Sequence, residues 1–152
     1  MKYTSTLLAA RSREESIRFY REVLGLEVIQ DFGANVTLSG GIALQTLESW
    51  QEFIGRKEVQ LQGNAMELYF EEDDMDGFVK RLEGLKISYV HPLLEHRWGQ
   101  RVVRFYDPNG HIIEVGENMT QVVRRFARSG MTEEQIARRM DVSLAYVQEC
   151  LG

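Results

Sequence analysis

Chemically versatile side chains crowd one stretch of the sequence, HPLLEHRWGQR at residues 91–101. Histidine exchanges protons near neutral pH, tryptophan stacks on planar molecules, and arginine pairs with carboxylates or phosphates. We therefore predict that His96 takes part in catalysis and that Trp98 and Arg101 contact a substrate. A structural loop, held by packing of Trp98 and by surface ion pairs, is the alternative, and the sequence leaves both interpretations open.

A second arginine follows on the same predicted strand, RVVRFY at residues 101–106. Side chains of a strand alternate between its two faces, so Arg101 and Arg104 lie on opposite faces. Both are candidates for substrate binding, and only one of them is expected to enter a binding site.

Other titratable groups favour structural interpretations. His91 precedes a proline and His111 follows a DPNG turn, which is typical of loop residues. The acidic run at 71–74 predicts a solvated connection in which Asp74 caps the following helix. Cys150 is the only cysteine, which excludes an intrachain disulfide and a cysteine metal cluster.

The composition of the chain limits the classes of molecule that it is expected to bind. The chain has 152 residues, 43% hydrophobic and 27% charged, as in ordinary globular proteins. Its net charge of -5 argues against a nucleic-acid partner, because the affinity of proteins for nucleic acids rests largely on Lys and Arg side chains. No apolar run approaches the roughly 18 residues needed to span a bilayer, and the N-terminus lacks the pattern of a secretion signal. We expect a cytoplasmic protein.

The order of elements is repeated along the chain. Residues 3–48 predict β-α-β-β-β, with the helix at 13–23 ended by Gly25. The second half follows the same order and ends in a hairpin across the DPNG turn. GLEV at 25–28 matches GLKI at 84–87, and the sequence therefore predicts two βαβββ modules.

Three segments carry a family resemblance: IRFYREVLGLEV at 17–28, EDDMDGFVKRLE at 72–83 and FYDPNGHIIEVGE at 105–117. Together they resemble the glyoxalase/bleomycin-resistance/dioxygenase family, the vicinal oxygen chelate superfamily. The resemblance implies an α+β fold in which the curved mixed sheets of modules 1–56 and 57–117 enclose a cleft. It also implies a small-molecule ligand, a homodimer, and up to four protein ligands to a divalent metal.

Carried over to this sequence, the metal positions of the family fall on Ser5, Gln45, Glu67 and Glu114. Ser5 and Gln45 replace the usual ligands, and their oxygens are weak donors to transition metals. Glu67 and Glu114 still predict a site for Mn, Ni, Zn or Mg. Without a metal, the two carboxylates would repel, which would raise the pKa of one and make it a general acid or base. Gln45 and Tyr69 are further substrate-binding candidates.

A helical tail at 118–152 follows the modules, with Thr132 and Ser143 as predicted N-caps. Its last two helices resemble a helix-turn-helix, but residues 144–152 contain no Lys or Arg, and the tail's five Arg face four acidic residues. We do not expect it to bind nucleic acid. Instead, apolar side chains should pack it against the domain or a second subunit: Val122, Phe126, Ile136, Met140, Leu144 and Val147.

Three functions remain open. The leading hypothesis is a lyase or isomerase that acts on a small polar organic molecule in the cleft, with Glu67 and Glu114 as base or metal ligands. In glyoxalase-type chemistry, such an enzyme abstracts a proton next to a carbonyl. The alternative is a non-catalytic protein that sequesters an antibiotic or metabolite. The third is a ligand-sensing regulator that acts through the helical tail.

Overall fold

The computed structural model describes all of residues 1–152, and its contacts divide the chain into two compact units. The first unit comprises residues 1–66 with 106–111, and the second comprises 67–105 with 112–152. Two four-stranded mixed sheets, their helices and a C-terminal helical region make an α+β fold, which confirms the predicted class. No helix is long and apolar enough to cross a membrane.

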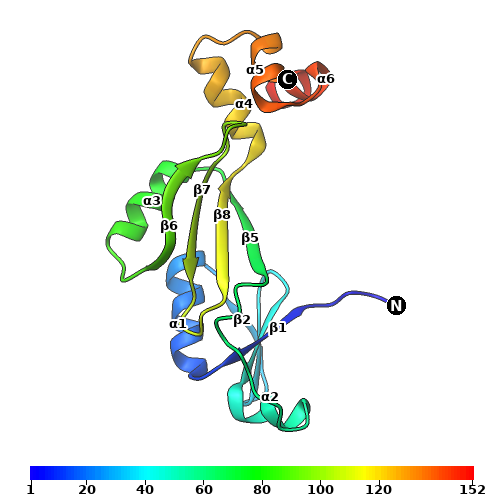
Figure 1. The fold of residues 1–152 in the computed structure, drawn as a ribbon, viewed down its shortest axis with the longest axis vertical. Coiled ribbons are helices and arrows are strands. Elements are labelled where there is room, and N and C mark those ends of the chain that lie inside the picture. The colour runs from blue at the N-terminus through cyan, green and yellow to red at the C-terminus, as the bar shows by residue number, and fades with distance from the viewer. The chain divides into compact units, whose positions relative to one another are not determined.

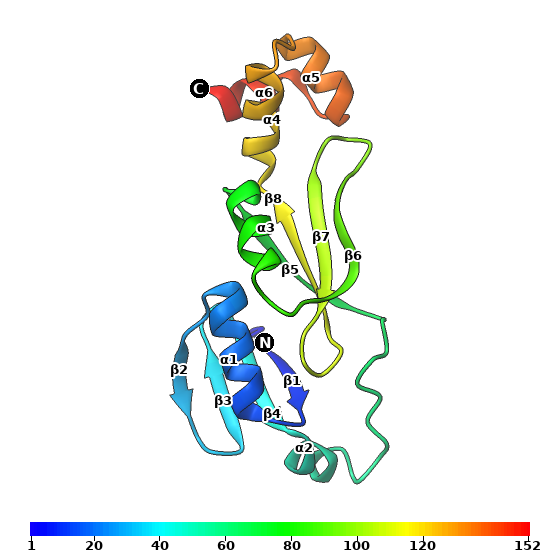
Figure 2. The same ribbon diagram turned by 90° about the vertical axis from the view of Figure 1, so that its left-hand side faces the viewer.

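The first unit has the predicted β-α-β-β-β order, followed by one additional helix. Its elements are β1 (Thr6–Ala10), α1 (Arg13–Leu24), β2 (Val28–Asp31), β3 (Asn35–Leu38), β4 (Ile42–Thr46) and α2 (Leu47–Phe53). The sheet order is β1-β4-β3-β2, and β1 runs parallel to β4. Figure 2 shows α1 along this sheet, where Tyr20 and Val23 of the helix are buried.

Local sequence explains where α1 begins and ends. The Ser12 side chain accepts a hydrogen bond from the backbone N–H of Glu15, and Gly25 ends the helix at φ 67°. The C-terminal Gly25 was predicted. Helix α2 was not, because seven residues are too few for a 3.6-residue period to be recognised.

The second unit repeats the order with β5 (Glu67–Glu72), α3 (Met75–Glu83), β6 (Ser88–Glu95), β7 (Arg101–Tyr106) and β8 (Ile112–Glu117). Its sheet order is β5-β8-β7-β6, with β5 parallel to β8 (Figure 1). Asp74 caps α3, as predicted, by accepting from the N–H of Gly77 at 3.0 Å. Phe78 of α3 packs against Phe105 of β7, with ring centroids 6.5 Å apart. We call the opposite face of this sheet the site face.

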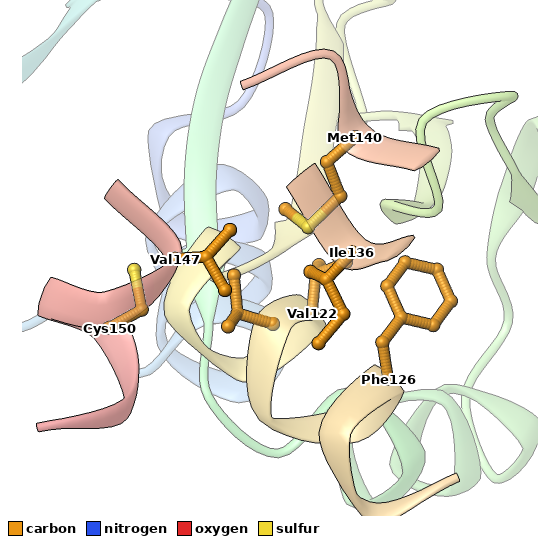
Figure 3. Close-up of a cluster of buried hydrophobic side chains, with 7 residues drawn as sticks. Val122, Phe126, Ile136, Met140, Val147 and Cys150 are labelled. Carbon is orange, nitrogen blue, oxygen red and sulfur yellow. The ribbon is translucent and has the colours of Figure 1, made fainter. Parts of the chain in front are cut away.

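Three helices complete the second unit: α4 (Met119–Arg128), α5 (Glu133–Met140) and α6 (Leu144–Leu151). The side chains of Thr132 and Ser143 accept the expected N-cap hydrogen bonds. The helices enclose a hydrophobic cluster, most of it labelled in Figure 3: Val122, Val123, Phe126, Ile136, Met140, Val147 and Cys150. Leu144, also expected to pack against the domain or a second subunit, is 39% exposed and is not part of this cluster.

The turn between β7 and β8 belongs to the first unit and is built around Asp107. One carboxylate oxygen accepts from the backbone N–H groups of Asn109 and His111, and the other accepts from the hydroxyl of Tyr20 at 3.0 Å. The Asn109 amide donates to the hydroxyl of Ser16. Burial would raise the pKa of Asp107, but contacts with His111 outweigh it and lower that pKa. The DPNG motif thus forms a turn that is held by hydrogen bonds of the buried side chains of Asp107 and Asn109.

Candidate functional site

Two carboxylates and one guanidinium meet on the site face of the second sheet. Glu67 lies at the start of β5, and Glu114 lies on β8 opposite Tyr69. Arg104 of β7 reaches both, with its Nε 2.8 Å from Oε2 of Glu67 and one terminal nitrogen in an ion pair with Glu114. The nearest nitrogen of His91, on β6, lies 3.2 Å from the same guanidinium.

Arg104 changes the electrostatics expected for this pair of carboxylates. The sequence predicted repulsion between Glu67 and Glu114, but a positive charge paired with both offsets that repulsion. Glu114 is only 5% exposed, so its charge depends on this partner. The Glu114 oxygen in this ion pair is itself buried, so the guanidinium of Arg104 is its close polar partner.

The loop between β6 and β7, residues 96–100, borders the same face. The rings of His96 and Trp98 stack with centroids 4.2 Å apart. The indole N–H of Trp98 donates to the side chain of Gln100 at 3.3 Å, and the Gln100 amide donates to the hydroxyl of Tyr69 at 3.0 Å. A side chain at Gly116 of β8 would collide with Gln100 and Tyr69, so this glycine allows the loop to approach the sheet.

The local environment shifts the titration of two of these groups. Partial burial, followed by the positive charge of Arg104, lowers the pKa of His96, so its ring is neutral at physiological pH. Partial burial also raises the pKa of Tyr69, which keeps that hydroxyl protonated. Tyr69 is nevertheless 48% exposed and presents much of its ring to solvent. The face therefore combines ring surfaces with hydrogen-bonding groups.

Arg101 is placed away from this group. It lies on the α3 side of the sheet, where its guanidinium binds Glu117 at 3.0 Å and Asp76 at 2.6 Å. Its donors are occupied by these carboxylates, whose hydrogen bonds raise the pKa of Arg101. Of the two arginines considered, Arg104 is the one on the site face.

The first unit holds the remaining candidates. Gln45 of β4 is 2% exposed, and its amide accepts from Asn35 and donates to Ser49. Ser5 precedes β1 and does not correspond to Glu67 when the two sheets are compared by register. Gln45 pairs with Ala9 as Glu114 pairs with Tyr69, so the position equivalent to Glu67 is Leu7. Leu7 lies two residues beyond Ser5, and the apolar strand carries no residue that distinguishes the two alignments in the sequence alone.

The residues present do not fit a divalent metal. Leu7 supplies no donor atom, and the Gln45 amide is already bonded to neighbours in its own unit. Glu67 and Glu114 both pair with Arg104, so the guanidinium occupies the carboxylate oxygens that a metal ion would need as ligands. No group of three or more His, Cys, Asp or Glu side chains in the structure could hold a metal ion.

Sequence reasoning missed two contributors to this face. His91 was interpreted as a loop residue, yet it lies on β6 beside Arg104. Gln100 was not singled out, although it links Trp98 to Tyr69. One signal was present: Gly116 interrupts the apolar strand β8, and a glycine within a strand indicates close approach of another group.

Comparisons with known proteins agree on one family. The model of the family described as "Glyoxalase-like domain" matches residues 3–120. An uncharacterized Bacillus subtilis protein, YraH, is 27% identical over 125 residues, which cover 76% of this chain and 97% of that one. A crystal structure of a protein of unknown function from Agrobacterium tumefaciens is 39% identical, with a TM-score of 0.70 over 78% of this chain and 94% of that one. A lactoylglutathione lyase from the same organism is 25% identical, with a TM-score of 0.61 and the same coverage.

Proposed function

Because the chain belongs to the glyoxalase-like domain family, we propose that it binds a small organic molecule on the site face of its second unit without a metal. The observation that carries the proposal is the placement of Arg104 between Glu67 and Glu114. A fixed guanidinium offsets the repulsion between the two carboxylates, so their side chains are held in place without a metal.

The charges favour a ligand with cationic or hydrogen-bond-donating groups. Three carboxylates lie on the site face, those of Glu67, Glu71 and Glu114. Arg104 forms ion pairs with two of them, Glu67 and Glu114. The remaining negative charge attracts cations. The stacked rings of His96 and Trp98 offer a flat surface to a planar group. Sequestration of a planar, cationic metabolite or antibiotic fits this combination.

Isothermal titration with metal-free bleomycin, a cationic molecule with flat rings, tests the proposal. We expect saturable binding with one probe per chain and no need for added metal. Glu67→Gln should weaken binding about tenfold, equivalent to about 1.4 kcal/mol. Glu83→Gln removes an equal charge from the exposed side of α3 and should leave the affinity unchanged. Equal affinity of the Glu67→Gln and Glu83→Gln variants would show that the carboxylate on the site face does not bind the probe.

A lyase or isomerase is the second candidate, with the Glu114 carboxylate on the site face as the general base that accepts a substrate proton. The similarity of this chain to a lactoylglutathione lyase provides the compound to test. The thioester absorbance of lactoylglutathione reports turnover, measured with and without Mn, Ni, Zn or Mg. Turnover that Glu114→Gln abolishes would favour the enzyme, and binding of bleomycin without turnover would favour sequestration.

A further inference from the structure

We propose that the helical tail positions the loop at the edge of the candidate site, with Arg125 of α4 as the positioning residue. The loop is residues 96–100, which follow Glu95 at the end of β6 and carry His96, Trp98 and Gln100. The proposal rests on the proposed function only in treating these three side chains as part of the site. The contacts by which the tail holds the loop are properties of the second unit alone.

Arg125 connects three parts of the second unit. Its guanidinium donates to both carboxylate oxygens of Glu117, at 3.1 and 3.0 Å, and to Glu95 at 3.3 Å. The same guanidinium donates to the backbone carbonyl of Gly99. A planar guanidinium has five N–H donors in fixed directions, so it fixes the two strand ends and the loop together.

Glu117 is the buried carboxylate that Arg125 binds in this arrangement. Its side chain is 3% exposed and pairs with Arg101 as well as with Arg125. Burial would raise the pKa of Glu117, but the hydrogen bonds from both arginines outweigh burial and lower that pKa. The side chain therefore stays ionised at neutral pH, and its arginine partners hold β7 and α4 against β8.

The loop is attached to the site face by Gln100. Its amide donates to the backbone carbonyl of Glu117 at 3.1 Å and to the hydroxyl of Tyr69 at 3.0 Å. Trp98 in turn donates to Gln100. Loss of the Arg125 contacts would therefore displace the loop. The stacked rings of His96 and Trp98 would move with it, and so would Gln100, the hydrogen-bond partner of Tyr69.

Two more tail residues contact the same loop. The ring of Phe126 occupies the space next to Gly99, and a Cβ built on that glycine would lie 2.2 Å from it. Arg139 of α5 donates to the carbonyl of Arg97 and to Glu95 at 3.2 Å. Arg139, which lies in the helices that resemble a helix-turn-helix, thus binds the loop and the end of β6. Because the family model ends at residue 120, these contacts come from a segment beyond the matched domain.

The test compares two arginines of the same helix. Arg125→Gln removes the contacts described, whereas Arg128→Gln makes the same charge change at an exposed position. Both variants carry Trp50→Phe, so that Trp98 is the single tryptophan. The readouts are Trp98 emission, its quenching by acrylamide, and titration of His96 by NMR. Far-UV circular dichroism checks that the tail helices persist.

For Arg125→Gln, we expect a red shift of Trp98 emission and a roughly twofold larger quenching constant, because a loosened loop exposes the indole. The pKa of His96 should rise towards its ordinary value as the ring gains solvent. Arg128→Gln should change neither. Arg125→Lys should restore little, because an ammonium group cannot reproduce the fork of donors.

A tail variant away from the loop separates positioning from general loosening. Val147→Ala leaves a cavity in the tail cluster without touching loop contacts. It should lower the stability of the tail but leave Trp98 emission and His96 titration unchanged. Unchanged Trp98 and His96 signals in Arg125→Gln, or equal changes in Val147→Ala, would overturn the proposal. Neither result depends on a ligand, so the proposed function would remain testable by titration.

Discussion

Replacing Gly99 with alanine should destabilise the second unit strongly. Gly99 has a φ of +93°, which non-glycine residues adopt at a cost of about 1 to 3 kcal/mol. An added Cβ would also lie 2.2 and 2.4 Å from two ring atoms of Phe126. The ring is part of the buried tail cluster, so it can move only by disturbing its neighbours. Overpacking of this kind costs about 1 to 3 kcal/mol.

The two effects can be separated with a matched control. Gly130 has a φ of +90° but no atom within 4 Å of a built Cβ. Gly130→Ala should therefore show the backbone cost alone. We expect Gly99→Ala to lose about 2 to 6 kcal/mol in total and to exceed Gly130→Ala by about 1 to 3 kcal/mol.

Urea unfolding followed by Trp98 fluorescence, in the Trp50→Phe background, measures the second unit. Phe126→Leu, combined with Gly99→Ala, should recover part of the loss, because a shorter side chain leaves room for the new methyl group. Equal stability losses for Gly99→Ala and Gly130→Ala would refute the close contact between the loop and α4. Absence of any recovery in the double variant would refute the role of the Phe126 ring.

Three further predictions concern buried polar contacts. Arg104→Gln should cost about 3 kcal/mol, because it leaves the charge of Glu114 buried and unpaired, and adding Glu114→Gln should recover much of that loss in urea unfolding. The pKa of Glu117 is lower in the folded state than in the unfolded state, so the folded state binds fewer protons. The contribution of Glu117 to stability is therefore complete above the unfolded pKa of about 4.3. It is lost as the pH falls through the folded pKa. Glu117→Gln should flatten this acid-side loss, and an unchanged pH dependence would contradict the assignment. Tyr20→Phe should cost about 1 to 3 kcal/mol by removing a donor to the buried Asp107 carboxylate, whereas Tyr106→Phe, whose exposed hydroxyl donates to Asn64, should cost little.

Features that depend on neighbours in the sequence were predictable. The helix end at Gly25 and the caps at Asp74, Thr132 and Ser143 follow from residue types at fixed offsets, because capping bonds join groups a few residues apart. The repeated order of elements and the family segments predicted the fold class for the same reason. The alternation of β7 also placed Arg101 and Arg104 on opposite faces.

The sequence by itself thus determined the elements of the two modules and the tail apart from α2, their order, and the resemblance to the family. Only the tertiary structure showed that Arg104 pairs with Glu67 and Glu114, and that Arg125 joins Glu117 to the loop at Gly99. These contacts link residues far apart in the chain, and many arginine and carboxylate pairings are compatible with the same pattern of strands. Register decided the remaining question of which residue corresponds to Glu67, because backbone pairing, and not residue type, fixes how two strands align.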